Sequence, residues 1–135
     1  MRVFLDANLL IYLNTMAEEA LRANYEDFYF RLVSEHRLYT DALVLDELLF
    51  VSKKKYGVPY SVTLDFIKSF VEPFTQLLQI GAEEYGEAEE IIRVYEIRPS
   101  DALHLGVMKV NGISWIVSED RELDRVSWVK RLWLA

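Results

Sequence analysis

Acidic residues recur in this chain at the points where apolar segments end, and their carboxylates could together bind metal ions. Asp6 directly follows the apolar run at residues 3–5, Asp120 follows soon after the run at 113–117, and Asp101 lies near the start of a helical pattern. Strands buried in parallel sheets read as unbroken apolar runs, and ligands of such sheets bind beyond the carboxyl ends of the strands. We therefore expect the three carboxylates to meet at one edge of a sheet.

Each of these acids also has a simpler, structural explanation. Asp6 or Asn8 can cap the helix that begins after the first strand. Asp101 can stabilise its helix through the macrodipole, by about 0.3–1 kcal/mol, and Ser100 can be the actual cap. The recurrence of acids at comparable junctions favours a shared site over independent caps.

A further acid lies inside a helical segment with apolar neighbours. The residues three and four positions from Glu47 are Leu43, Val44, Phe50 and Val51. Because an unpaired carboxylate is costly to bury, Glu47 must meet a cation, a metal ion or the edge of a cleft. Asp46 has similar neighbours, so the spacing leaves open which of the two points inward. At the other end of the chain, Asp124 lies four residues after Asp120 and would share its face of a helix.

Because the chain has no cysteine, its candidate metal ligands are mainly carboxylates. Such a set suits Mg²⁺ or Mn²⁺, which prefer oxygen ligands. Two such ions about 3.5–4 Å apart can activate water and stabilise the leaving oxygen of a phosphodiester. The chain has only His36 and His104 and no glycine-rich phosphate loop, so metal-assisted hydrolysis fits better than a side-chain nucleophile. His104 shares a helix face with Asp101, and we expect a hydrogen-bonded, partly buried histidine rather than a metal ligand.

The composition indicates one globular domain over residues 1–135, with 52% hydrophobic and 27% charged residues. No apolar run approaches the roughly 18 residues of a membrane helix, and no signal peptide is evident, so we expect a cytoplasmic protein. The net charge of −7 argues against passive nucleic-acid binding but not against a nuclease that reaches phosphates through cations. Lys53, Lys54, Arg98 and Arg121 are the candidates for RNA contacts.

Strand and helix patterns alternate along the chain, which predicts an α/β fold with a mainly parallel sheet. Asp41 is expected to cap a helix that Gly57 ends. The helix at 61–71 is expected to carry Leu64, Ile67, Phe70 and Val71 on one side. The strands are expected at residues 3–5, 37–40, 74–80, 113–117 and 129–134. The first helix is expected to begin near residue 9. Further helices are expected at 17–36, 42–56, 61–71, 83–96 and 102–110, with a short one near 123–126.

Four short motifs together resemble PIN domains, which include the VapC-type toxins of toxin–antitoxin pairs. The motifs are FLDANLLIY at 4–12, LVLDELL at 43–49, SDALHL at 100–105 and IVSED at 116–120. The resemblance implies a three-layer fold, with a parallel five-stranded sheet flanked by helices, and an endoribonuclease that depends on Mg²⁺ or Mn²⁺. It also implies a homodimer and an antitoxin that inserts a basic side chain among the acids.

The resemblance also assigns roles by position. Asp6, Glu47, Asp101 and Asp120 would be the metal-binding catalytic acids, with Glu47 chosen over Asp46. Asn8 and Ser118 would support them, and Asp124 would be an extra ligand. Glu119 is a departure, because the family often carries a neutral or basic residue there.

Two other functions remain as alternatives. The first is a PIN-like domain in RNA processing, or an inactive module that binds RNA or protein. The second is a receiver-like signalling domain, which needs a phospho-accepting aspartate after a middle strand and a lysine after a late one. Here Glu47 lies inside a helix and Lys130 begins a strand, which disfavours the receiver.

Overall fold

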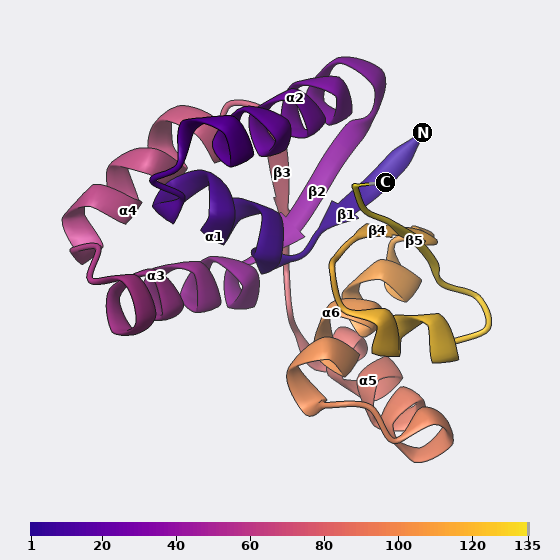
Figure 1. Cartoon of the computed structure of the whole chain (residues 1–135). Coiled ribbons are helices and arrows are strands. Elements are labelled where there is room, and N and C mark those ends of the chain that lie inside the picture. The colour runs from indigo at the N-terminus through magenta and orange to yellow at the C-terminus, as the bar shows by residue number, and fades with distance from the viewer. Residues whose placement is uncertain (135) are drawn as a thin grey trace.

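A parallel five-stranded sheet organises the computed structural model, which describes residues 1–134 (Figure 1). The strand order is β3-β2-β1-β4-β5. The strands are β1 (Arg2–Leu5), β2 (Arg37–Asp41), β3 (Thr75–Leu78), β4 (Trp115–Val117) and β5 (Lys130–Leu132). The central strand β1 pairs with β2 and β4 and buries Val3, Phe4 and Leu5 completely. The predicted parallel α/β sheet is confirmed.

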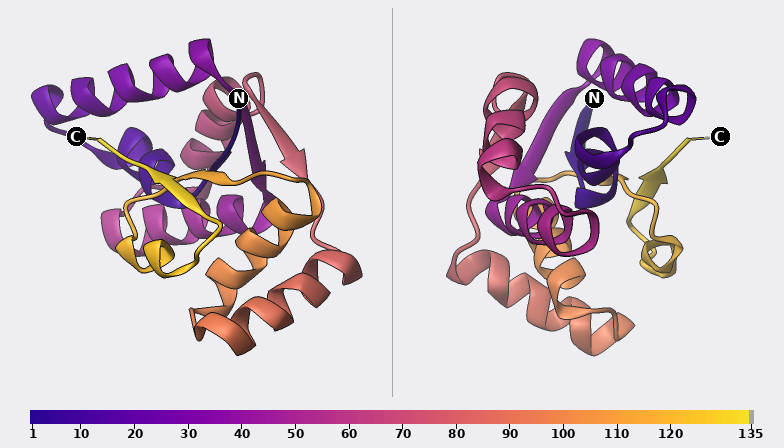
Figure 2. Two further views of the ribbon diagram at one scale, coloured as in Figure 1. Left: turned by 90° about the vertical axis from the view of Figure 1, so that its right-hand side faces the viewer. Right: turned by 60° about the vertical axis from the view of Figure 1, so that its left-hand side comes forward.

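The helices lie on both sides of this sheet (Figure 2). The chain passes from β1 to β2 to β3 in one direction, then returns across the sheet to β4 and β5. Because such crossovers are right-handed, the two directions place their helices on opposite faces. The first set is α1 (Ala7–Thr15), α2 (Glu19–Glu35), α3 (Ala42–Tyr56) and α4 (Tyr60–Phe66), and the second is α5 (Ala82–Tyr95) and α6 (Pro99–Val110). The reversal falls between β1 and β4, the position where open α/β sheets bind ligands.

Local signals in the sequence set the helix ends. Asp6 caps α1 by accepting the N–H of Ala7 at 2.8 Å, and Asp41 caps α3 by accepting the N–H of Val44 at 3.0 Å. Helix α3 ends at Gly57, whose φ of 72° is readily adopted by glycine. The predicted cap and the predicted stop of α3 are therefore both confirmed.

The segment after α3 differs from its predicted form. It is α4 followed by a π-helical turn, Ile67–Val71, instead of one regular helix. Ile67 and Val71 are buried, but Leu64 and Phe70 are 54% and 49% exposed, so the predicted four-residue apolar side is wrong. A π turn has a wider hydrogen-bond spacing than an α-helix, which shifts the following side chains around the axis. A 3₁₀ turn at Arg121–Arg125 replaces the short helix expected before β5.

A close crossing of α5 and α6 fixes the second helical layer. A Cβ on Gly106 would lie 2.4 Å from the main-chain oxygen of Glu84, so only glycine fits there. The carboxylate of Glu84 is buried and accepts the N–H of Gly81 at 2.6 Å, which holds the start of α5. The close approach of Gly106 to α5 sets the position of α6, and with it the position of Asp101 in the first turn of α6. Within residues 1–134, none of the helices has the length and apolar character needed to cross a membrane.

Candidate metal centre

Asp6 is held rigidly where β1 and β4 end. Its main-chain N–H donates to the oxygen of Val117 at 3.0 Å, which extends the pairing of the two strands. Its carboxylate accepts the hydroxyl of Ser118 at 2.7 Å and the N–H of Ala7 at 2.8 Å. The residue is only 5% exposed. Asp6 is therefore both the cap of α1 and a carboxylate of fixed orientation at the switch point of the sheet.

Hydrogen bonds hold the loop after β4 against the start of α1. Asn8 accepts the main-chain N–H of Glu119 at 3.1 Å, and Ser118 Oγ accepts the N–H of Asp120 at 3.1 Å. Asp120 in turn caps the 3₁₀ turn by accepting the N–H of Glu122 at 2.9 Å. Asn8 and Ser118 thus connect the loop that carries Asp120 to the segment that carries Asp6.

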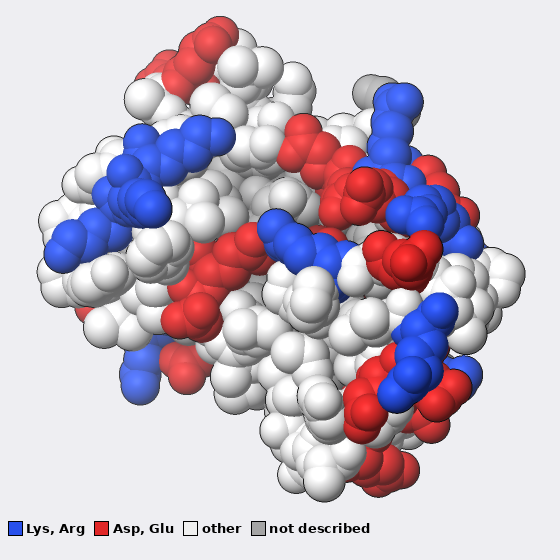
Figure 3. Space-filling view, turned by 90° about the horizontal axis from the view of Figure 1, so that it is seen from below, with Lys and Arg blue, Asp and Glu red and all other residues white. Residues whose placement is uncertain are grey.

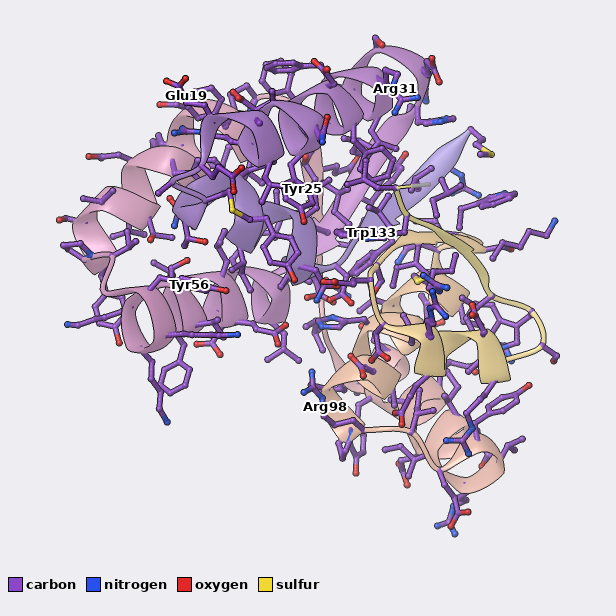
Figure 4. The ribbon with its side chains drawn as sticks, in the orientation of Figure 1. Glu19, Tyr25, Arg31, Tyr56, Arg98 and Trp133 are labelled. Atoms are coloured by element: carbon purple, nitrogen blue, oxygen red, sulfur yellow. The ribbon has the colours of Figure 1, made fainter. Side chains whose placement is uncertain are left out.

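Glu47 and Asp101 approach from the two helical layers and share one cation. Nη2 of Arg98 lies 3.5 Å from Oε1 of Glu47 and 3.7 Å from Oδ1 of Asp101. Figure 4 shows Arg98 at the start of α6, across the gap from α3. Asp101 is 6% exposed, and the Glu47 side chain is 34% exposed. Asp46 is exposed, so Glu47 is the acid of this pair that faces the cluster.

The electrostatics of the cluster favour an added cation. Burial, followed by the charge of Asp6, raises the pKa of Asp101 to about 6, although Arg98 partly offsets the effect. Asp120 also raises the pKa of Asp101. The pKa of Glu47 is raised by burial and then by Asp6, again against Arg98. A bound cation would offset the repulsion that raises the pKa values of Glu47 and Asp101.

His104 is a further candidate ligand beneath the acids. It is 2% exposed, and its Nδ1 lies 2.8 Å from Oδ2 of Asp41. Burial opposes its charged form, but the bond to Asp41 and the nearby acids outweigh burial and raise the pKa of His104. Asp6, Glu47 and His104 each offer one ligand atom within 4.8 Å of the others. Since Nδ1 bonds to Asp41, Nε2 is the nitrogen that remains for a metal ion, an arrangement common for metal-bound histidines.

The predicted hydrogen bond of His104 is present. The ligand role, which the prediction disfavoured, is supported by the closeness of His104 to Asp6 and Glu47. The signal for the ligand role was its spacing of three from Asp101, which places it on the same helix face. The sequence could not show that Asp41 would be the hydrogen-bond partner, because the two residues are 63 positions apart. The donor set of carboxylate oxygens and one imidazole nitrogen suits a divalent cation such as Mg²⁺ or Mn²⁺.

The remaining predicted residues lie outside this cluster. Asp124 is exposed and forms a two-bond ion pair with Arg131, at 2.9 and 3.1 Å, so its carboxylate is already engaged. Lys53 and Lys54 are exposed near the end of α3, and Arg121 is exposed in the 3₁₀ turn. Figure 3 shows acidic side chains around a hollow on the face seen from below, with basic side chains at its left over the end of α3.

The cluster opens into a cavity of about 370 Å³ between α3 and α6. Its polar lining is Asp46, Glu47, Arg98, Ser100 and His104, and apolar side chains of α3 complete it. The cavity therefore gives a ligand access to Glu47 and His104.

Solved structures of toxin proteins have the same fold as this chain. DNA-bound VapBC from Salmonella typhimurium is 16% identical, with a TM-score of 0.74 and coverage of 98% of both chains. VapC20 from Mycobacterium tuberculosis, described as a sarcin–ricin loop cleaving toxin, is 17% identical, with a TM-score of 0.72 and coverage of 94% of this chain and 96% of that one. VapBC2 from Rickettsia felis, bound to a promoter DNA fragment, is 19% identical, with a TM-score of 0.71 and coverage of 98% of both chains.

The family model of the PIN domain matches residues 3–129, so the chain belongs to the PIN domain family. The resemblance that the four motifs indicate is thereby confirmed, as is the three-layer fold that it implies. No curated protein matches the chain.

Proposed function

We propose that this PIN domain is a divalent-metal-dependent endoribonuclease that hydrolyses RNA phosphodiester bonds as the toxin of a toxin–antitoxin pair. The observation that carries the proposal is the convergence of acids from distant segments on the buried carboxylate of Asp6. Asp6 comes from the end of β1 and Glu47 from α3. Asp101 comes from the first turn of α6, and Asp120 from the loop after β4. The solved VapBC and VapC structures, which share the fold, support the choice of toxin.

In this proposal Asp6, Glu47, Asp101 and Asp120 hold Mg²⁺ or Mn²⁺, with His104 as a further donor. Such ions, when bound, polarise the phosphate and lower the pKa of an attacking water. The chain itself supplies orientation. Ser118 and Ala7 each donate a hydrogen bond to one oxygen of Asp6, so this carboxylate needs little rearrangement to bind a metal ion.

Arg98 is proposed to have two roles at this site. Without a metal ion, its guanidinium partly neutralises Glu47 and Asp101. Its side chain is 60% exposed, so it can also turn toward an incoming RNA phosphate, which suits the planar fork of arginine. Lys53 and Lys54 would then hold phosphates of the strand further from the cleaved bond, and Arg121 would hold one on the side of Asp120.

The acidic site also suits a basic protein partner. We propose an antitoxin that places a basic side chain between Glu47 and Asp101, where the Arg98 guanidinium lies in this structure. We further propose that the protein acts in the cytoplasm as a homodimer. Separation by size, with and without the partner, tests the assembly state.

The nuclease proposal is tested by comparing two neighbouring acids of α3. Glu47→Gln should abolish Mn²⁺-dependent cleavage of RNA and weaken Mn²⁺ binding measured by calorimetry, as should Asp6→Asn. Asp46→Asn is the matched control. Asp46 lines the same cavity, but it is exposed and outside the group of ligand atoms, so Mn²⁺ binding and cleavage should stay as in the wild type. Full cleavage by Glu47→Gln and Asp6→Asn would refute the proposal. Metal binding without cleavage of any RNA would instead support the alternative of a binding module.

A further inference from the structure

A second hollow adjoins the acid cluster on the side of β5. It has a volume of about 550 Å³ and is lined by Glu119, Arg121, Arg131, Trp133 and Leu134. Glu119 directly precedes Asp120, so the hollow begins beside a proposed metal ligand. A ligand group in the hollow would therefore lie next to the phosphate that the acids act on.

Trp133 gives this hollow a supported aromatic wall. Its ring centroid lies 6.3 Å from those of Tyr12 and Tyr25, and 5.9 Å from that of Phe28 in an edge-on contact. Tyr12 and Tyr25 stack on each other, with their ring centroids 4.9 Å apart. Trp133 is partly exposed. The indole is thus held in place by three rings and still offers surface on which a base can stack.

Glu119 gives the hollow a fixed acceptor. Its Oε2 accepts the hydroxyl of Tyr12 at 2.5 Å, and its main-chain N–H donates to Asn8. Burial, followed by the hydrogen bond to Glu119, raises the pKa of Tyr12, so the phenol stays protonated and keeps donating. Because each carboxylate oxygen has two acceptor positions, Glu119 can still accept N–H groups from a ligand.

Two arginines complete the walls. Arg131 is fixed, since it bonds to both oxygens of Asp124 and donates to the main-chain oxygen of Ser118 at 3.1 Å. Arg121 is exposed at the same hollow. A guanidinium is suited to phosphate. Because Arg131 is paired with Asp124, Arg121 is the cation that the hollow offers to phosphate. An aromatic wall, an acceptor for N–H groups and this cation are together the complement of a nucleotide.

We propose that this hollow binds one unpaired nucleotide of the substrate RNA, next to the cleaved phosphate, and that Glu119 selects guanine. The inference rests on the proposed nuclease function. Guanine presents two adjacent N–H donors on its Watson–Crick edge, which match the two oxygens of a carboxylate. Adenine and cytosine place a ring acceptor beside the amino group, and uracil has one donor between two acceptors, so a carboxylate meets repulsion with each of them.

The test uses the indole N–H signals of the whole protein in NMR spectra, without added metal so that the nucleotides cannot bind through a metal ion at the acids. The guanosine, adenosine, cytidine and uridine 5′-monophosphates are titrated separately. GMP should shift the Trp133 signal, assigned with Trp133→Phe, and leave those of Trp115 and Trp128 in place. Its dissociation constant should be about tenfold lower than those of the other three, the discrimination expected of one good bidentate contact.

Glu119→Gln should remove that preference, because an amide presents one acceptor and one donor instead of two acceptors. Glu122→Gln is the matched control, since Glu122 is an exposed acid of the adjacent turn and does not line the hollow. Equal affinity for all four nucleotides, absence of a saturable Trp133 shift, or an unchanged preference in Glu119→Gln would overturn the proposal.

A parallel cleavage assay separates this inference from the function on which it rests. Metal-dependent cleavage of RNA by the wild type, with no preference at any guanine, would overturn the guanine site and leave the nuclease intact. Selective binding of GMP by a protein that cleaves no RNA would instead contradict the nuclease proposal.

Discussion

On the proposed function, Arg98 competes with metal ions for Glu47 and Asp101, and its removal should strengthen metal binding and weaken RNA binding. Its guanidinium lies 3.5 Å from Glu47 and 3.7 Å from Asp101, and it is 60% exposed. Exposed ion pairs contribute about 0.2–1 kcal/mol each. When a divalent ion displaces Arg98, the protein loses these two ion pairs, and the ion is also repelled by the guanidinium charge. Loss of the side chain should therefore favour the ion by about 1.4 kcal/mol, or about tenfold in affinity.

The assay compares Arg98→Gln with Arg98→Lys in Mn²⁺ titrations followed by calorimetry. Arg98→Gln should bind Mn²⁺ about tenfold more tightly than the wild type, and Arg98→Lys should stay near the wild type because it keeps the charge. RNA affinity should fall in Arg98→Gln, since a phosphate contact is lost. Circular dichroism confirms that both variants are folded. Unchanged or weaker Mn²⁺ binding by a folded Arg98→Gln protein would refute the reasoning.

Three further predictions concern stability. Without metal ions, the free energy of unfolding should fall by up to about 3 kcal/mol as the pH rises from about 4 to about 6, because the folded protein holds the pKa of Asp101 at about 6 and so favours its protonated form; Asp101→Asn should flatten this dependence in urea unfolding, and an unchanged slope would contradict it. Asp41→Ala should destabilise the protein by about 3 kcal/mol, because it removes the cap of α3 and leaves His104 buried without its partner; a shift below about 1 kcal/mol in thermal unfolding would disagree. Gly106→Ala should lower stability by about 1–3 kcal/mol through its clash with α5, whereas Gly86→Ala, with open space around it, should not, and equal effects of the two would exclude the clash.

The strand ends were predictable because short apolar runs followed by acids carry local information. The run that precedes Asp6 is buried on both faces in the sheet, so it reads the same in sequence and in structure. Caps and stops such as Asp41 and Gly57 were also predictable, since they depend on the residue and its immediate neighbours. These signals were sufficient for the fold class and for the candidate acids.

The partners of the charged side chains could not be predicted, because they depend on how distant segments pack. The pairing of His104 with Asp41 joins α6 to the end of β2, and that of Asp124 with Arg131 depends on where β5 lies. The orientation of Phe70 depends on a π turn, which no simple periodicity indicates. Glu47 and Asp46 both have apolar neighbours three and four positions away, so the spacing could not separate them, and the family resemblance selected Glu47.

The pairing of β1 with β4 has a consequence for when the acid cluster assembles during synthesis. The bond from Ser118 to Asp6 spans 112 residues, and parallel strands cannot be joined by a tight hairpin. A nascent chain that has not yet reached Asp120 therefore lacks both an acid of the cluster and the strand that orients the first one. Such contacts form late, after the long intervening segment has closed. The ribosome that makes this protein accordingly holds an incomplete cluster until nearly the whole chain has emerged.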